Sequence, residues 1–227
     1  MTILALGDSF TLGAELPDMP LQHTIDQTFA NTWYDEQTRR HCLIEPSQLS
    51  WPALLGKKLN QDVENWGLLG GSNDRIFRLA STLTKEYSLI ICAWTDVSRL
   101  DWFNNNKELP VSVNSHALFS RFPAIEHYYK YHYDSNQAIQ RCLGQIITLQ
   151  NHFKFINQKF VFVNSFNQLP ADPLVSKIDT RYYIDTNSSM YNWCKHLPIG
   201  KDNHPLEFGH ELIANKIYQH LLEENIL

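Results

Sequence analysis

The chain lacks long hydrophobic runs and any strong excess of charge. It has 227 residues, with 19 Lys and Arg against 24 Asp and Glu, which gives a formal net charge of −5. No apolar run reaches the roughly 18–20 residues that a membrane-spanning helix needs. Nucleic-acid-binding proteins place Lys and Arg against phosphate, and this mildly acidic chain has no basic run. We therefore expect no membrane span and no nucleic-acid partner.

Paired cysteines and a targeting segment are also lacking. The four cysteines, Cys42, Cys92, Cys142 and Cys194, are scattered and form no CxxC motif. We expect no metal or redox motif from them and favour reduced thiols in a cytoplasmic protein, although their even number leaves disulfides open for an exported one. The opening MTILALGDSF is too short and too uncharged for a signal peptide and predicts a buried strand. The expected location is the cytoplasm.

Apolar and aromatic residues, by contrast, are plentiful. Hydrophobic residues make up 43% of the chain and charged residues 19%, which fits a folded core rather than a disordered chain. The length fits one α/β domain over residues 1–227, with long insertions at about 14–49 and 99–134. Insertions of this length are commonly lids or binding loops. Aromatic residues make up 12% of the chain. They either stack on or enclose a ligand, or they fill the core, which is the commoner use.

Apolar spacing predicts strands that alternate with helices. Short apolar runs predict strands at 2–6, 63–67, 88–94 and 159–166. Helical spacing predicts helices at 50–60, 72–87, 138–156 and 207–222. Ser50 is the expected cap of the first helix, and Ser72 or Asn73 that of the second. The alternation predicts a three-layer α/β/α sandwich around a mostly parallel sheet of about five strands.

The first predicted strand is followed at once by Gly7-Asp8-Ser9-Phe10. Ser9 then lies at the carboxyl end of a strand and at the start of a helix, where ligands bind in open parallel sheets. Such a turn exposes the hydroxyl, and nearby backbone N–H groups can stabilise an oxyanion. Taken alone, the four residues fit a helix cap better, with Asp8 accepting backbone N–H groups in the turn.

A second polar motif, Asp202-Asn203-His204-Pro205, precedes the last predicted helix. A histidine in such a loop can act as general base toward a serine hydroxyl, and a neighbouring carboxylate can fix its tautomer. His210 is an alternative base, but it lies one turn into the predicted helix, and we expect it on the helix surface. Because the chain has 10 His, the motif alone is weak.

The two motifs together resemble those of the SGNH or GDSL-type hydrolase superfamily. GDSF matches the family's Gly-Asp-Ser-Leu block, so the resemblance implies that Ser9 is the nucleophile. The stretch from Asn65 to Ser72, NWGLLGGS, matches the block whose glycine N–H enters the oxyanion hole, which implies Gly70, with Gly71 as the alternative. DNHP implies His204 as the base. The resemblance also implies a flavodoxin-like strand order of 2-1-3-4-5.

The third block departs from the family pattern. The family reads Gly-x-Asn-Asp, whose Asn donates to the oxyanion, whereas this chain reads Ala-Trp-Thr-Asp at residues 93–96. The hydroxyl of Thr95 can donate one hydrogen bond, but it is shorter and also accepts. Either Thr95 substitutes with a shifted geometry, or Asn73 fills in, or the enzyme is slow. Asn73 also has a simpler interpretation as a helix cap.

The acid and one cation are less well matched. The family spacing is Asp-x-x-His, but Lys201 stands three residues before His204, so the acid role passes to Asp202. Asp202 alternatively caps the final helix. Arg99 lies just past the third block, where it holds an anionic or sugar substrate, is solvated, or forms an ion pair with Asp96 or Asp101.

The sequence therefore predicts a serine esterase without a metal or organic cofactor. Its substrate would be an acyl ester, acetyl esters included, on a small molecule or a carbohydrate. Trp102 and Phe103 would stack on a sugar ring or an acyl chain, or else pack the second insertion onto the core. The alternative is a non-catalytic carbohydrate- or partner-binding protein on the same scaffold, which the altered third block and the shifted acid motivate.

Overall fold

The computed structural model describes residues 2–19, 34–35, 40–41, 44–104, 107–111 and 122–227. Its central sheet has five strands, which are β1 (Thr2–Gly7), β4 (Asp62–Gly67), β5 (Leu89–Trp94), β8 (Phe160–Asn164) and β9 (Tyr183–Ile184). They are ordered β4-β1-β5-β8-β9, and every neighbouring pair is parallel. Counted along the chain this is the order 2-1-3-4-5, which confirms the predicted sheet.

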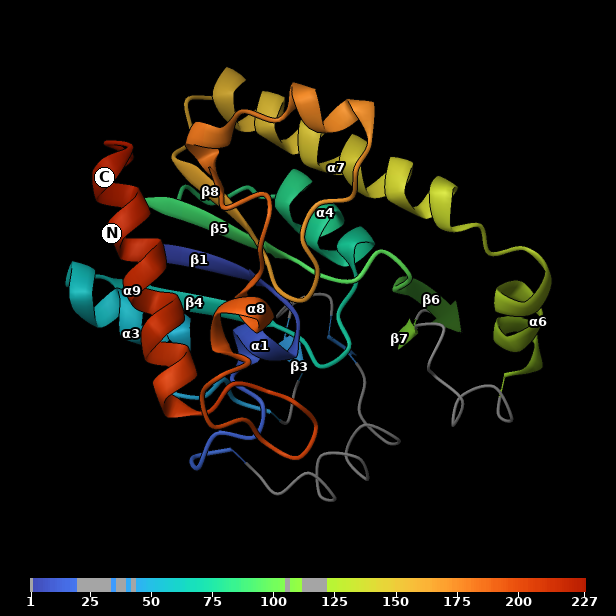
Figure 1. Ribbon diagram of the computed structural model, residues 1–227, viewed down its shortest axis with the longest axis horizontal. Coiled ribbons are helices and arrows are strands. Elements are labelled where there is room, and N and C mark those ends of the chain that lie inside the picture. Colours follow the sequence, from blue (N-terminus) through green and yellow to red (C-terminus); the bar gives the residue numbers. More distant parts are fainter. Residues whose placement is uncertain (1, 20–33, 36–39, 42–43, 105–106, 112–121) are drawn as a thin grey trace.

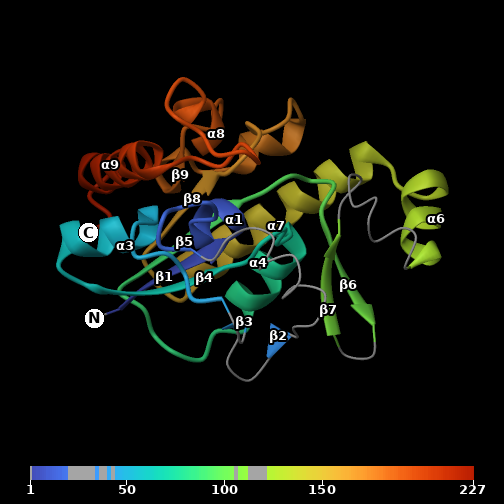
Figure 2. The same ribbon diagram turned by 90° about the horizontal axis from the view of Figure 1, so that it is seen from below.

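Helices cover both faces of this sheet (Figures 1 and 2). One face carries α4 (Asn73–Ser81) and α7 (Ser135–Phe155). The other face carries α1 (Ser9–Leu12), α3 (Trp51–Leu59), α8 (Met190–Cys194) and α9 (Glu207–Glu223). The predicted α/β/α sandwich is confirmed.

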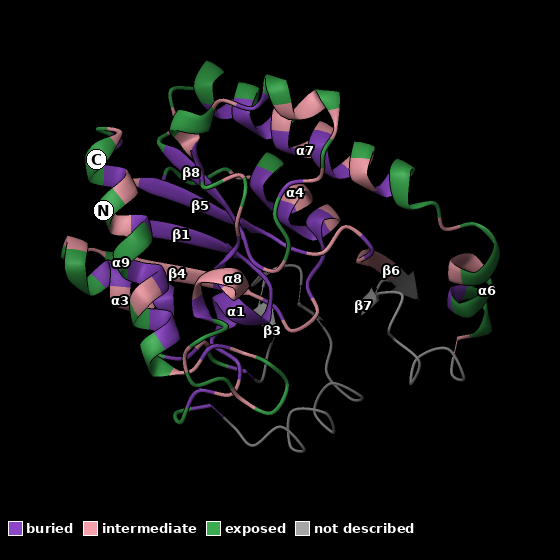
Figure 3. Ribbon diagram, viewed as in Figure 1, coloured by how far each residue is buried: buried purple, intermediate pink, exposed green. Residues whose placement is uncertain are grey.

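The two cores explain why the strands read as continuous apolar runs. Along β1, Leu4 and Leu6 pack under α4 and α7, whereas Ile3 and Ala5 pack under α3 and α9. Because successive side chains point to opposite faces and both faces are covered, no position on the strand is free to be polar. Figure 3 shows β1, β5 and β8 buried along their length, with exposed residues on the outer sides of the helices and on the loops.

Most predicted helices are confirmed, but one ends early. Ser72 caps α4 as expected, with its side chain accepting from the backbone N–H of Arg75 at 3.1 Å. The helix predicted over 72–87 stops at Ser81, six residues short. At its end the hydroxyl of Thr82 donates to the carbonyl of Arg78 at 2.9 Å, so a side chain takes up a carbonyl that the helix leaves free. The apolar spacing alone did not reveal this stop.

The segment predicted to be the second insertion contains elements that the sequence did not predict. It forms an antiparallel hairpin of β6 (Leu100–Asn104) and β7 (Lys107–Val111), followed by α6 (Pro123–Tyr131). These elements project beside the sheet, away from α9 (Figures 1 and 2). In the first insertion, β2 (Tyr34–Asp35) pairs with β3 (Arg40–His41). The stacking role predicted for Phe103 falls on a side chain outside the described part of the structure.

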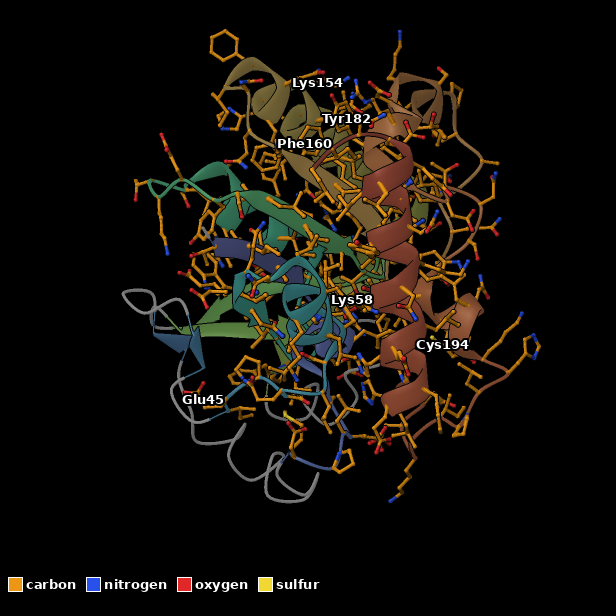
Figure 4. The ribbon with its side chains drawn as sticks, turned by 90° about the vertical axis from the view of Figure 1, so that its left-hand side faces the viewer. Glu45, Lys58, Lys154, Phe160, Tyr182 and Cys194 are labelled. Carbon is orange, nitrogen blue, oxygen red and sulfur yellow. The ribbon has the colours of Figure 1, made fainter. Side chains whose placement is uncertain are left out.

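The outer edge of the sheet is closed by aromatic packing rather than by a sixth strand. Phe160 of β8 stacks on Tyr182, with ring centroids 4.6 Å apart, in the short helix η2 (Thr180–Tyr182). The ammonium of Lys154 lies 5.0 Å from the Tyr182 ring (Figure 4). Another short helix, η1 (Pro173–Lys177), packs on α7 nearby.

The described cysteines lie in the two cores. Cys92, Cys142 and Cys194 are buried free thiols, and Cys42 lies outside the described residues. Burial raises the pKa of the Cys142 thiol to about 12, so it stays protonated at neutral pH. Across the described ranges, no group of three His, Cys, Asp or Glu side chains is arranged to hold a metal ion. No helix in those ranges is both long and apolar enough to cross a membrane.

Candidate active site

The parallel strands bring three of the predicted motifs to one edge of the sheet. Asp8 and Ser9 follow β1, Gly70 follows β4, and Thr95 follows β5. Ser9 starts α1 and is only 4% exposed. Asp8 caps that helix, because its Oδ1 accepts from the backbone N–H of Phe10 at 3.0 Å. The Ser9 turn is therefore fixed by the residue that precedes it.

Two backbone N–H groups at this edge are free to bind an anion. Among the described residues, neither the N–H of Ser9 nor that of Gly70 has a hydrogen-bond acceptor. Gly70 has φ of 69°, a left-handed conformation that glycine adopts without a steric penalty. The N–H of Gly71, the alternative donor, is occupied, since it donates to the carbonyl of Leu68 at 2.9 Å. Of the two glycines, it is therefore Gly70 whose N–H has no acceptor among the described residues.

The side chains of Thr95 and Asn73 also reach this edge, but each is committed elsewhere. The Thr95 hydroxyl donates to Asp8 Oδ2 at 2.6 Å. Asn73 Oδ1 accepts from the N–H of Thr95 at 2.8 Å, and Asn73 Nδ2 donates to the Thr95 carbonyl at 3.1 Å. Both residues are buried. Their donors therefore hold the turn after β5 in place and are not offered to a ligand.

Arg99 joins the same cluster. Its Nη1 lies 3.4 Å from Asp8 Oδ2 and 3.3 Å from the carbonyl of Gly71. Its guanidinium lies over the ring of Phe166, 4.7 Å from the centroid. Of the alternatives left open for Arg99, an ion pair does form, but its partner is the fully buried carboxylate of Asp8 and not Asp96 or Asp101.

The C-terminal loop carries His204 to the N-terminal turn. The loop closes on itself, since the N–H of Gly200 donates to the His204 carbonyl at 2.8 Å. Asn203 turns the chain in a left-handed conformation, with φ of 63°. The imidazole of His204 meets the ring of Phe10 edge-on, with centroids 5.7 Å apart. Two segments almost 200 residues apart thus meet beside Ser9.

The carboxylate that holds His204 is supplied by Glu15. Glu15 Oε2 lies 2.8 Å from His204 Nδ1, and both side chains are 12% exposed. The backbone N–H of Asp202 donates to both Glu15 oxygens, at 3.0 and 3.2 Å. Gly200 leaves room for this carboxylate, because any side chain there would collide with it. Asp202 thus reaches the pair through its backbone, and its exposed side chain makes no hydrogen bond within the described ranges.

This arrangement fixes the protonation of His204 Nδ1. An ionised carboxylate only accepts hydrogen bonds, so Nδ1 carries a proton, and in the neutral imidazole it is Nε2 that keeps a lone pair. Partial burial raises the pKa of Glu15, but the hydrogen bonds from His204 and the Asp202 amide outweigh it and keep that pKa below its usual value of 4.5. Glu15 is therefore ionised at neutral pH. No sequence motif pointed to Glu15, a lone acidic residue in an irregular segment.

His210 is not on the helix surface, as the sequence predicted, but fully buried. Its Nδ1 accepts from the backbone N–H of Trp51 at 3.1 Å and so satisfies a free donor at the start of α3. Burial, with a smaller effect from His204, lowers the pKa of His210 to about 3. It is a neutral structural residue, because α9 packs this side of its first turn onto α3.

Comparison with known proteins gives the fold. No family model matches the chain, and no curated protein matches it either. Solved structures do match along almost the whole chain, and the three named here are each 12% identical to it. They include LAE5, an alpha/beta hydrolase from the Lake Arreo metagenome (TM-score 0.53, covering 96% of this chain and 94% of that one). They also include the esterase EstA from Pseudoalteromonas sp. (0.51, 98% and 97%) and the acetylxylan esterase Axe2 from Geobacillus stearothermophilus (0.50, 97% and 93%). These matches confirm the fold that the resemblance to SGNH or GDSL-type hydrolases implies.

Proposed function

We propose that this protein is a serine ester hydrolase with Ser9 as nucleophile, His204 as general base and Glu15 as the carboxylate that orients the base. The observation that carries the proposal is the 2.8 Å contact between Glu15 and His204 Nδ1, beside the turn that begins at Ser9. A histidine held at Nδ1 by a carboxylate presents Nε2 as the base, which is the arrangement that activates a serine hydroxyl.

In the first step, Ser9 Oγ attacks the acyl carbonyl and His204 Nε2 takes its proton. The carbonyl π electrons move to oxygen, and the N–H groups of Ser9 and Gly70 stabilise this oxyanion. Glu15 accepts the Nδ1 proton in a hydrogen bond throughout and stabilises the imidazolium. When the tetrahedral intermediate collapses, His204 returns the proton to the leaving alcohol and an acyl-Ser9 ester remains.

In the second step, water replaces the alcohol. His204 Nε2 removes a proton from the water as it attacks the acyl-Ser9 carbonyl, and the same two N–H groups hold the new oxyanion. Collapse expels Ser9 Oγ, which regains its proton from His204, and the acid product leaves. The reaction needs only groups of this chain and water.

The substrate class in this proposal is an acyl ester on a small molecule or a carbohydrate, with acetyl as the first acyl group to test. The fold shared with an acetylxylan esterase supports this choice. Trp102, half-buried on the β6–β7 hairpin, is the aromatic residue that would stack on a sugar ring.

Hydrolysis of 4-nitrophenyl acetate by the wild-type protein and by Ser9→Ala tests the proposal. We expect the substitution to remove nearly all turnover, a loss of about 10⁶-fold for a nucleophile of this kind. Ser165→Ala is the matched control, because Ser165 is also a buried serine, at the end of β8, and has no role in the proposed chemistry. Labelling with a fluorophosphonate should modify Ser9 alone. Equal turnover of wild type and Ser9→Ala would refute the proposal.

One observation favours the alternative, a carbohydrate- or partner-binding protein without catalysis. The hydroxyl of Thr95 is turned toward Asp8, so the oxyanion side has no free neutral side-chain donor among the described residues. Under this alternative, the wild-type protein would bind acetylated oligosaccharides in calorimetry without releasing acetate. It would also remain unlabelled by the fluorophosphonate.

A further inference from the structure

The oxyanion side of the site is short of donors. In the proposed chemistry, two backbone N–H groups face the developing negative charge. Two neutral side chains reach the same edge, but both already donate hydrogen bonds within the protein. Thr95 donates to Asp8, and Asn73 donates to the Thr95 carbonyl. Catalytic sites of this kind depend strongly on each donor aimed at the oxyanion. A further source of positive charge is therefore expected nearby.

Arg99 has N–H groups at this position that make no hydrogen bond with the described residues. Only its Nη1 is engaged, and Nε and Nη2 have no acceptor within the described ranges. The side chain is 17% exposed, so these donors are partly screened from water. Its planar guanidinium lies over the Phe166 ring, which together with the Nη1 contacts fixes the orientation of the whole group.

The residues that hold Arg99 are the direct neighbours of the two free N–H groups. Asp8 immediately precedes Ser9, and Gly71 immediately follows Gly70. Phe166 in turn packs on Phe10, with ring centroids 4.4 Å apart. Arg99 thus contacts the residue before the nucleophile, just as His204 contacts the residue after it.

The guanidinium of Arg99 also balances the negative charge of Asp8. Asp8 is fully buried beside Ser9, and an unbalanced carboxylate at that point would oppose an oxyanion on the substrate. Arg99 balances this charge through one nitrogen and keeps the remaining N–H groups for a second anion. Hydrogen bonds from a charged donor are about twice as strong as those between neutral groups.

We infer that Arg99 is a catalytic residue that donates to the transition-state oxyanion in place of a neutral amide side chain. This inference rests on the proposed ester hydrolysis. It assigns the positive charge to the reaction itself and not to recognition of an anionic substrate.

The test compares Arg99→Gln and Arg99→Lys with the wild-type protein. Arg141→Gln is the matched control, since Arg141 forms an Arg–Asp ion pair with Asp74 at the same 3.4 Å distance but lies on α7. The kcat and KM values are measured with 4-nitrophenyl acetate and with the anionic mono-4-nitrophenyl glutarate, and the Tm of each variant is recorded. Thr95→Asn is then added to Arg99→Gln, because it introduces the amide donor that the resemblance expects at that position.

We expect Arg99→Gln to lower kcat by about 10- to 100-fold for both esters, with KM little changed, and Arg99→Lys to retain part of the rate. The added Thr95→Asn should recover part of the lost kcat. An unchanged kcat, a KM effect confined to the anionic ester, or no recovery by Thr95→Asn overturns the inference. If Arg99→Gln fails to fold, Arg99→Lys takes its place: a reduced kcat for both esters supports the inference, and an unchanged kcat overturns it. Turnover that needs Ser9 but not Arg99 refutes this inference alone, whereas a wild-type protein without turnover refutes the proposed function.

Discussion

The two halves of the candidate site depart from the expected pattern in opposite ways. On the proposed acid–base side, a carboxylate does contact His204 Nδ1, as the motif predicted, but it belongs to Glu15, 189 residues away along the chain. On the oxyanion side, the position is kept and the chemistry changes: Thr95 stands at the end of β5, but its hydroxyl is spent on Asp8. Glu15 and His204 lie in loops, so the orienting carboxylate can come from a different part of the sequence. Thr95 directly follows a strand, where the sheet fixes the position of the residue.

Among the changes that test this comparison, the largest effect is expected from Glu15→Gln. The amide keeps the shape of the side chain but removes its charge, so it no longer favours the His204 tautomer with Nδ1 protonated or stabilises the imidazolium. We expect kcat for 4-nitrophenyl acetate to fall by about 10³- to 10⁴-fold, as for other serine hydrolases that lose the orienting carboxylate. Steady-state kinetics near pH 7 measure this loss.

Asp202→Asn is the control for that comparison. It changes a carboxylate two residues from His204 and keeps the backbone N–H that donates to Glu15. We expect turnover close to that of the wild-type protein. A large loss in Asp202→Asn together with a small one in Glu15→Gln would return the acid role to the position that the sequence motif suggested.

The next effect concerns the oxyanion side. Thr95→Val removes the hydroxyl that donates to Asp8 and leaves a buried carboxylate with one hydrogen bond fewer. A hydrogen bond to a charged group contributes about 1.5–3 kcal/mol, so the free energy of unfolding should fall by about that amount in a urea titration. We expect kcat to fall as well, because Asp8 caps the Ser9 turn. Thr95→Asn, which keeps a donor, should remain active, and its complete inactivation would contradict this account of Thr95.

How much the sequence predicted follows the same division. Most elements were predictable because strands buried on both faces must be continuously apolar, as in β5 and β8, whereas the strand order followed only from the resemblance to a known family. The motifs at Ser9 and His204 were visible because each has a fixed local spacing. Glu15 was not, since its contact depends on how two loops meet, and the space left by Gly200 is a tertiary property. The early end of α4 was hidden as well, because Leu83 and Tyr87 continue the apolar spacing beyond Ser81 and pack on the same core without being helical.

The smallest effect concerns His210, the buried histidine that takes no part in the proposed chemistry. His210 is neutral in the folded protein, with its pKa lowered to about 3 by burial, whereas the unfolded chain binds a proton near pH 6.5. Between these values the unfolded state holds more protons, so its contribution makes the free energy of unfolding decrease as pH falls from 6.5 toward 3, by up to about 1.4 kcal/mol per pH unit. His210→Asn keeps an acceptor for the Trp51 N–H but does not titrate. Urea titrations at pH 7 and pH 5 should therefore show a smaller loss of stability on acidification for the variant. If the stability of the wild-type protein and that of His210→Asn depend on pH in the same way, His210 is not buried in its neutral form.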